Sequence, residues 1–203
     1  MVQGAIPSKG IAVRLWAAAR AEFALRGYNG ARVQGIARRA GCNVALLYRH
    51  WSSKKALYLE VLRSVWMERG EAITAHFERE KGAAGVVGAY LDVLLADTEG
   101  SQILVREYLD GGPFLSQLVA SDPSLAEPIR RARNALLHGN GNALRAGLDP
   151  MMTVLAIGGI AALASSAQEA ARPFLDRPVS AETWRQHLAD LLLNGLVGGA
   201  PSR

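Results

Sequence analysis

The sequence predicts an all-α protein of about nine helices, with a small N-terminal domain followed by a larger one. Apolar residues recur at spacings of three and four along most of the chain. No segment alternates apolar and polar residues as a strand does, and glycines and prolines separate the periodic segments. The chain has 203 residues, half of them hydrophobic and a fifth charged, so it can bury a sizeable core.

The first predicted helix covers residues 11–26. Leu15, Ala19 and Phe23 recur every four residues and define its buried face. Gly27 follows, where a left-handed C-terminal cap would end the helix.

Two short helices are predicted next, over 32–40 and 44–50. Gly41 closes the former, and Asn43 is a good N-cap for the latter. Two short helices joined at a glycine fit a helix-turn-helix, whose second helix lies in the DNA major groove. A helix pair in an ordinary bundle can show the same turn, so the spacing alone leaves both interpretations open.

The rest of the chain predicts further helices with recognisable starts. Ser53 can cap a helix that runs toward residue 78. Asp122 and Asp149 each precede a proline, which combines an N-cap with a favoured first-turn residue. The last two helices are expected over 150–170 and 181–197, and the apolar stretch from Met151 to Ser166 is shorter than the roughly 20 residues of a membrane span.

Positive charge is concentrated at the N-terminus. Residues 1–55 contain ten Lys or Arg and one acid, a net charge of +9, whereas the remainder sums to −4. This asymmetry indicates that the N-terminal part faces a polyanion. We expect the protein to be cytoplasmic, because it has a single cysteine, Cys42, and its first residues do not show a signal-peptide pattern.

The N-terminal part of the chain, with anchor residues from Phe23 to Lys54, resembles the TetR family of regulators. About 45 residues, under a quarter of the chain, carry the likeness. The matching anchors are Phe23, Gly27-Tyr28, Val33-x-x-Ile36-Ala37-x-x-Ala40-Gly41, Leu47-Tyr48-x-His50-Trp51 and Ser53-Lys54. The resemblance implies a helix-turn-helix DNA-binding domain over 1–55 and a helical effector-binding and dimerisation domain over 56–203.

The same resemblance implies the residues that contact DNA. Tyr48, His50 and Lys54 would bind phosphates, although each alone is equally typical of packing, capping or plain surface charge. Five residues of the recognition helix over 44–50 and its N-cap would contact DNA bases: Asn43, Val44, Ala45, Leu46 and Arg49. The three apolar side chains can read only thymine methyl groups or groove shape, so Arg49 and Asn43 would supply the polar contacts. Arg32 and Arg38 are further candidates for phosphate contact.

In TetR-like proteins the later helices enclose a ligand cavity. Candidate lining residues share a large apolar, aromatic or imidazole side chain: Trp66, Tyr90, Leu94, Tyr108, Phe114, Leu118 and His138. Such residues are more often ordinary core. If they line a cavity, they predict an apolar or aromatic effector, with Arg106, Glu107 or Asp110 orienting a polar group. We expect no cofactor and no metal.

The last two helices of the family pack against a second subunit. The residues expected at this homodimer interface are Ala156, Ile160, Leu163, Trp184, Leu188, Leu191 and Leu192. Burial of both helices within one protomer is the alternative.

These features predict a cytoplasmic DNA-binding regulator, a repressor released from a palindromic operator by a small molecule. A C-terminal domain that binds a protein partner is the alternative. The four histidines are scattered and catalytic motifs are missing, so an enzyme is not expected. A membrane is not an expected partner.

Overall fold

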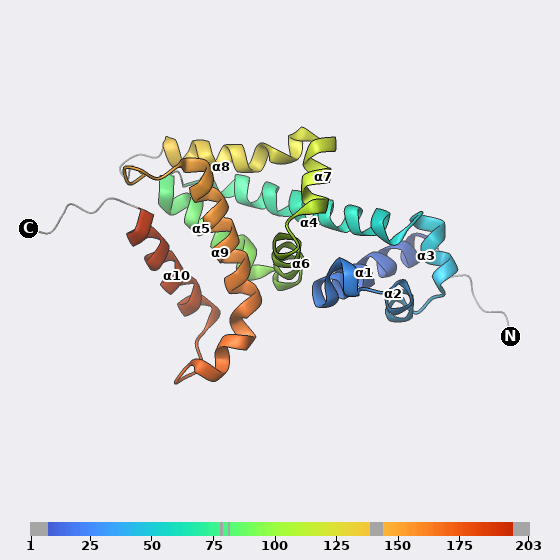
Figure 1. Cartoon of the computed structure of the whole chain (residues 1–203). Helices are drawn as coiled ribbons and strands as arrows, with labels where there is room; N and C mark the ends of the chain where they lie inside the picture. Colours follow the sequence, from blue (N-terminus) through green and yellow to red (C-terminus); the bar gives the residue numbers. More distant parts are fainter. Residues whose placement is uncertain (1–7, 78, 81, 139–143, 197–203) are drawn as a thin grey trace, which may run out of the picture.

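A computed structural model describes residues 8–196 except 78, 81 and 139–143. Within these residues the protein has ten α-helices, two short 3-10 helices and no strand (Figure 1). The predicted all-α class is confirmed, with one helix more than the nine expected. Residues 1–7, where a signal peptide was not expected, lie outside the described part.

The N-terminal end is built from α1 (Ser8–Gly30), α2 (Val33–Ala40), α3 (Val44–His50) and the start of α4 (Lys54–Phe77). The first helix ends at Gly27 as expected. Gly27 has the non-helical angles φ 65° and ψ −179°, which kink the chain, and a further helical turn, included in α1, follows up to Gly30. A glycine is favoured there because other residues rarely adopt that backbone conformation.

The other helices are α5 (Gly82–Ala96), α6 (Thr98–Leu109), α7 (Pro113–Ser121), α8 (Glu127–Leu137), α9 (Pro150–Ala171) and α10 (Ala181–Leu196), with 3-10 turns at Pro123–Ala126 and Arg172–Phe174. The predicted start signals are confirmed. The carboxylate of Asp149 accepts a hydrogen bond from the Met152 N–H at 2.8 Å, and Asp122 accepts one from the Ser124 N–H at 3.1 Å. Both satisfy backbone donors that the first helical turn leaves free.

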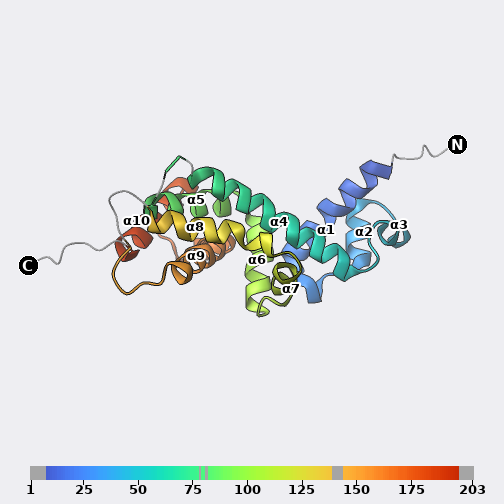
Figure 2. The same ribbon diagram turned by 90° about the horizontal axis from the view of Figure 1, so that it is seen from above.

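Two apolar clusters hold the fold together, and α4 contributes to both. The first joins α1–α4 with residues of α6 and α7, among them Phe23, Leu47 and Tyr58. The second joins α5, α8, α9 and α10 around residues such as Leu91 and Ile157. In Figures 1 and 2, α4 runs from beside α3 to the end of the molecule that carries α5 and α8. The expected domain boundary at residue 55 falls in the first turn of this shared helix.

The apolar stretch from Met151 to Ser166 is shorter than a membrane span, as expected, but the helix that contains it is longer. With the 3-10 turn that follows, the helix runs from Pro150 to Phe174, which is long and apolar enough to cross a membrane by length and composition alone. Only a third of its most apolar window is buried. One side packs on α5, α6 and α8, and the other carries exposed apolar residues.

Candidate nucleic-acid interface and ligand cavity

The turn between α2 and α3 has the predicted helix-turn-helix geometry. Gly41 is left-handed, with φ 67° and ψ 39°, and its N–H donates to the carbonyls of Ala37 and Arg38. Asn43 caps α3, because its Oδ1 accepts a hydrogen bond from the Leu46 N–H at 3.0 Å. These two local interactions set the angle at which α3 leaves α2.

The predicted base-reading residues of α3 differ in exposure. Ala45 and Arg49 are exposed, as is the N-cap residue Asn43, whereas Val44 and Leu46 are half-buried. The predicted phosphate partners Tyr48 and His50 are also exposed. Leu47 is fully buried and anchors the helix in the N-terminal cluster. The exposed side of α3 therefore combines the polar ends of Asn43, Tyr48, Arg49 and His50 with a single methyl group from Ala45.

Basic side chains surround this surface. Arg32, Arg38, Arg39, Arg49 and Lys55 are all exposed. None of them forms an ion pair within the described part of the chain. Exposed arginines without an ion pair on a helix-turn-helix produce a positive potential that attracts phosphates.

The one acid of this region is withdrawn from the surface. Glu22 is 6% exposed and its Oε1 lies 3.1 Å from Nε of Arg26. A Cβ at Gly35 would lie 2.9 Å from the same oxygen, so the glycine gives the carboxylate its place between α1 and α2. Glu22 thus offsets the charge of Arg26, while Arg32, Arg38 and Arg39 form no ion pair within the described residues.

Lys54 lies between α4 and the end of α1. Its Nζ donates to the carbonyl oxygens of Tyr28 at 2.8 Å and Ala31 at 3.1 Å, and sits 4.5 Å from the centre of the Tyr28 ring. These contacts fix the first turn of α4 against α1. A phosphate contact, as the resemblance implies, would use the third donor of the ammonium group.

A cavity of about 50 Å³ lies among α4, α5, α6, α8 and α9. Thirteen residues line it, and four of the seven predicted lining residues are among them: Trp66, Tyr90, Leu94 and Tyr108. Tyr90 is 5% exposed, and burial raises the pKa of its hydroxyl well above the ordinary value. The hydroxyl therefore stays neutral and can serve as a hydrogen-bond donor.

The other three predicted residues lie elsewhere. Phe114 and Leu118 of α7 pack in the N-terminal cluster, where the Phe114 ring lies 5.0 Å from that of Tyr58. His138 ends α8, is exposed, and its Nδ1 lies 2.8 Å from the carbonyl oxygen of Asn134. The structure does not bring these three residues to the cavity.

The polar residues expected to orient a ligand instead connect helices. Arg106 donates to the carbonyl oxygens of Ala24 and Leu25 near the kink in α1. Glu107 is 1% exposed and accepts hydrogen bonds from the Tyr58 hydroxyl at 3.0 Å and from two N–H groups that begin α7. Both residues join the N-terminal end to α6.

A charged cluster beside the cavity was not predicted from the sequence. Asp97 caps α6 through its Oδ1, and its Oδ2 pairs with Arg69 of α4 and with Arg20 of α1. Burial lowers the pKa of Arg69, and Asp97 opposes that effect. The N-cap position of Asp97 is a readable signal, but nothing in the local sequence indicates which arginines it binds.

The expected interface residues on α9 and α10 fall into two groups. Ala156, Ile160, Leu163 and Leu191 are exposed, the last three at 42%, 57% and 62%. Leu188 is 7% exposed within the protomer, and Trp184 and Leu192 pack partly on the same cluster against α5. One side of α10 is therefore core, as the alternative interpretation held, while α9 presents an uncovered apolar face.

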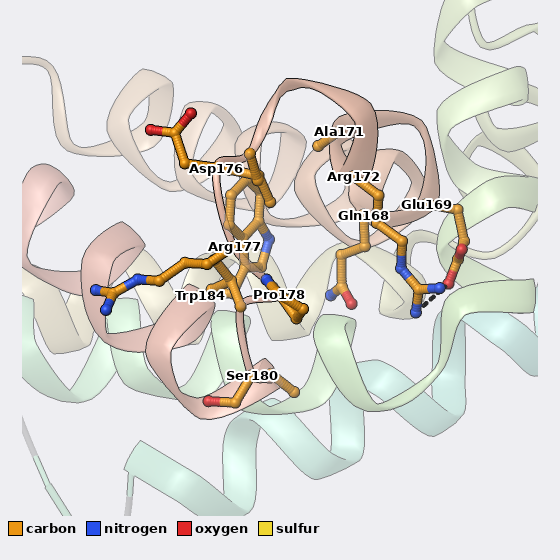
Figure 3. A pocket seen from close by; sticks show the side chains of 12 residues that line it. Gln168, Glu169, Ala171, Arg172, Asp176, Arg177, Pro178, Ser180 and Trp184 are labelled. Atoms are coloured by element: carbon orange, nitrogen blue, oxygen red, sulfur yellow. Dashed lines mark ion pairs between the residues drawn. The ribbon is translucent and has the colours of Figure 1, made fainter.

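A surface pocket of about 510 Å³ lies where the connection joins α9 to α10 (Figure 3). The Trp184 ring stands at its centre between Arg177 and Gln168, and Arg172 pairs with Glu169 at 2.9 Å along one side. The buried indole N–H has no hydrogen-bond partner among the described residues. Among those residues no group of three or more His, Cys, Asp or Glu could hold a metal ion.

Comparison with known families identifies the N-terminal domain. Residues 15–61 match the model of bacterial regulatory proteins of the tetR family. These residues are therefore similar to the DNA-binding part of tetR-family regulators. The match covers all of α2 and α3 and the capped turn between them. It also covers Lys54 and the two residues, Tyr28 and Ala31, whose carbonyl oxygens Lys54 binds.

Two curated tetR relatives extend the likeness beyond this domain. The HTH-type transcriptional regulator RutR of Escherichia coli (strain K12) is 28% identical over 133 residues, which are 60% of this chain and 63% of RutR. The HTH-type transcriptional activator FasR of Mycolicibacterium smegmatis is 32% identical over 95 residues, 45% of this chain and 43% of FasR. The chain thus spans less than two thirds of either relative.

A solved structure resembles nearly the whole fold. The transcriptional regulator FadR from Bacillus subtilis, in complex with stearoyl-CoA, superposes with a TM-score of 0.66 at 17% identity. The superposition covers 91% of this chain and 98% of FadR. At this identity the likeness concerns the fold alone.

Proposed function

We propose that the protein is a DNA-binding transcriptional regulator that acts in the cytoplasm as a homodimer. The observation that carries this proposal is the capped turn at Gly41 and Asn43, which presents α3 amid exposed, unpaired arginines. The match of residues 15–61 to the tetR family and the names of RutR and FasR support it.

Contacts with DNA divide by chemistry. The exposed Tyr48, His50 and Arg32, together with the third donor of Lys54, would bind phosphates and set the position of the protein on the duplex. Arg49 and the amide of Asn43 would read base edges. Ala45 offers a methyl contact, and the half-buried Val44 and Leu46 would respond to thymine methyls and groove shape.

Dimerisation would cover the apolar face of α9. Met152, Ala156, Ile160 and Leu163 lie on one side of this helix at helical spacing and are not buried within the protomer. Leu191 of α10 is also exposed, whereas Leu188 is buried within the protomer. Two such faces packed together would form a four-helix interface around a two-fold axis.

An apolar small molecule would regulate DNA binding through the cavity lined by Trp66, Tyr90, Leu94 and Tyr108. Because α4 carries both cavity residues and Lys54, a shift of α4 would alter the separation of the two recognition helices. Binding of effector and operator would then compete through a two-state equilibrium. We favour a repressor, although FasR is named an activator.

Footprinting tests this proposal. The full-length protein is mixed with duplexes tiled across the DNA that flanks its own coding region, and protected bases are mapped with hydroxyl radicals. We expect two protected half-sites about 34 Å apart, one helical turn. Uniform protection of every duplex, or none, would refute a site-specific regulator. A site that apolar compounds fail to release would favour a C-terminal domain that binds a protein partner.

A further inference from the structure

Arg69 contributes an unpaired positive donor to an apolar cavity. It is the only charged residue among the thirteen described residues that line the cavity. The residue is 5% exposed, and its Nε–H is buried without a hydrogen-bond partner in the described part of the chain. A buried donor without an acceptor is costly, so an acceptor that enters the cavity would be bound favourably.

The remaining lining is apolar and aromatic. Ile73, Leu94, Leu104 and Val154 are buried there, and the ring of Tyr90 lies over Gly158, where a Cβ would come within 3.0 Å of it. Resting on the regulatory function proposed above, we propose that the effector is an amphipathic carboxylate: its carboxylate binds Arg69 and its apolar body occupies this cavity.

The body of such a molecule would enter between α4 and α8. The cavity of about 50 Å³ is much smaller than typical ligand sites of roughly 300–1,000 Å³. A groove of about 450 Å³ outside it shares three lining residues with it, Trp66, Gly70 and Pro128. A Cβ at Gly70 would lie 2.5 Å from Cγ of Pro128, so α4 and α8 are in close contact at two of the residues that the cavity and the groove share. A separation of the two helices at this contact would join the two spaces.

The carboxylate would compete with Asp97 for Arg69. A bidentate pair at the edge of the guanidinium that carries the unpartnered Nε needs Nε and Nη2 together. Nη2 now donates to Asp97, at 2.9 Å to its carbonyl oxygen and 2.8 Å to Oδ2. A Cβ at Gly100 would lie 2.1 Å from Nη2, so the guanidinium is packed directly on the first turn of α6.

Displacement of Asp97 would reach the DNA-binding end through Arg20. The same Oδ2 of Asp97 that binds Arg69 also pairs with Arg20 of α1. One carboxylate therefore joins α1, α4 and the start of α6, and a ligand that takes Arg69 from it changes this junction. Because coupling between two sites is reciprocal, a protein held on DNA would bind the carboxylate more weakly.

Calorimetry on the full-length protein without DNA tests the proposal. The probes are straight-chain carboxylates of six to sixteen carbons and the primary alcohols of equal length. We expect at least one carboxylate to bind about tenfold tighter than its alcohol, because a hydrogen bond to a charged group has about that effect on an equilibrium constant. Arg69→Met should reduce carboxylate affinity about tenfold and leave alcohol affinity unchanged. Arg133→Met, which removes a charge of α8 away from the cavity, should change neither.

Asp97→Asn provides the variant that keeps the fold. Asparagine retains the N-cap of α6 and loses the charge that holds Arg69. The proposal expects it to bind the carboxylate several-fold tighter than wild type, with alcohol affinity unchanged. Equal affinity for carboxylates and alcohols, no saturable carboxylate binding, or weaker binding by Asp97→Asn would overturn the proposal. A protein that binds carboxylates yet no operator would overturn the regulatory function instead.

Discussion

Lys54 binds Tyr28 twice, through a hydrogen bond of 2.8 Å to its carbonyl oxygen and through its ring, whose centre lies 4.5 Å from Nζ. Tyr28 lies just beyond the kink at Gly27, and Lys54 begins α4. The long helix that lines the cavity is therefore fixed to the DNA-binding domain at its first residue. A residue that the family resemblance assigns to DNA also sets the geometry of the domain.

Lys54→Ala should weaken DNA binding and destabilise the fold together. Loss of two hydrogen bonds from the ammonium group is expected to cost about 1–3 kcal/mol in the free energy of unfolding. Affinity should fall for specific and random duplexes alike, since phosphates are common to both. Urea denaturation and fluorescence anisotropy measure the two effects. Lys55→Ala is the matched control, because Lys55 makes none of these backbone contacts. Equal losses of stability in the two variants would contradict a stabilising role for the Lys54 hydrogen bonds.

Arg49→Ala should weaken the preferred site most. A base contact is expected to supply about 1–3 kcal/mol of discrimination, whereas a phosphate contact affects every sequence. Arg39→Ala, which removes an exposed arginine of α2, should reduce affinity for all duplexes by a similar factor. Competition anisotropy with specific and random duplexes separates the two. Equal losses on both kinds of DNA for Arg49→Ala would reject its role in base reading.

Ile160→Glu should convert the dimer into monomers. The side chain is 42% exposed in the protomer, so a charge there costs little in folding but is costly inside an interface. Leu109→Glu is the control, since Leu109 is 81% exposed on α6. Analytical ultracentrifugation reports the mass of each variant. A wild-type monomer, or an Ile160→Glu dimer, would contradict the predicted interface, and wild-type flotation with liposomes would indicate that α9 meets a membrane instead.

Asp97 should make stability depend on pH in the acid range. Burial raises the pKa of its carboxyl, but Arg69, the Gly100 N–H and Arg20 lower it more, so the net pKa is below the ordinary value. The unfolded chain then binds this proton at a higher pH than the folded protein does. The stabilisation is present above the ordinary pKa and is lost as pH falls through the folded pKa.

Urea denaturation between about pH 5 and pH 2 measures this effect. The free energy of unfolding should fall less steeply for Asp97→Asn than for wild type over that interval. Parallel curves for the two proteins would show that Asp97 is not held by the arginines in solution.

Local signals in the sequence predicted the helix-turn-helix correctly because its geometry depends on local contacts. Gly41 and Asn43 form their caps with residues three or four positions away. Gly27 shows both the use and the limit of such signals: the break in the helix was predicted, but the further helical turn that follows it was not. The further turn to Gly30 is held by Lys54, more than twenty residues along the chain.

The cavity was predictable only in part, because residue type does not decide which core a side chain joins. Tyr108 and Phe114 are close in sequence and alike in chemistry, yet Tyr108 lines the cavity and Phe114 packs beside Tyr58. Glu107 makes the difference, since it accepts hydrogen bonds from the first N–H groups of α7 and turns that helix toward the N-terminal end. Arg69 looks like a solvated residue of an amphipathic helix until Asp97, 28 residues away, is placed next to it.

The salt dependence of DNA binding tests the central claim most directly. Fluorescence anisotropy compares the best footprinted duplex with a random duplex of equal length over a series of NaCl concentrations. We predict a Kd for the footprinted site about a thousandfold or more below that for random DNA. The logarithm of affinity should fall linearly with the logarithm of salt concentration, by about 0.9 per phosphate contact. Equal affinities for the two duplexes, or an affinity that salt leaves unchanged, would contradict the assignment.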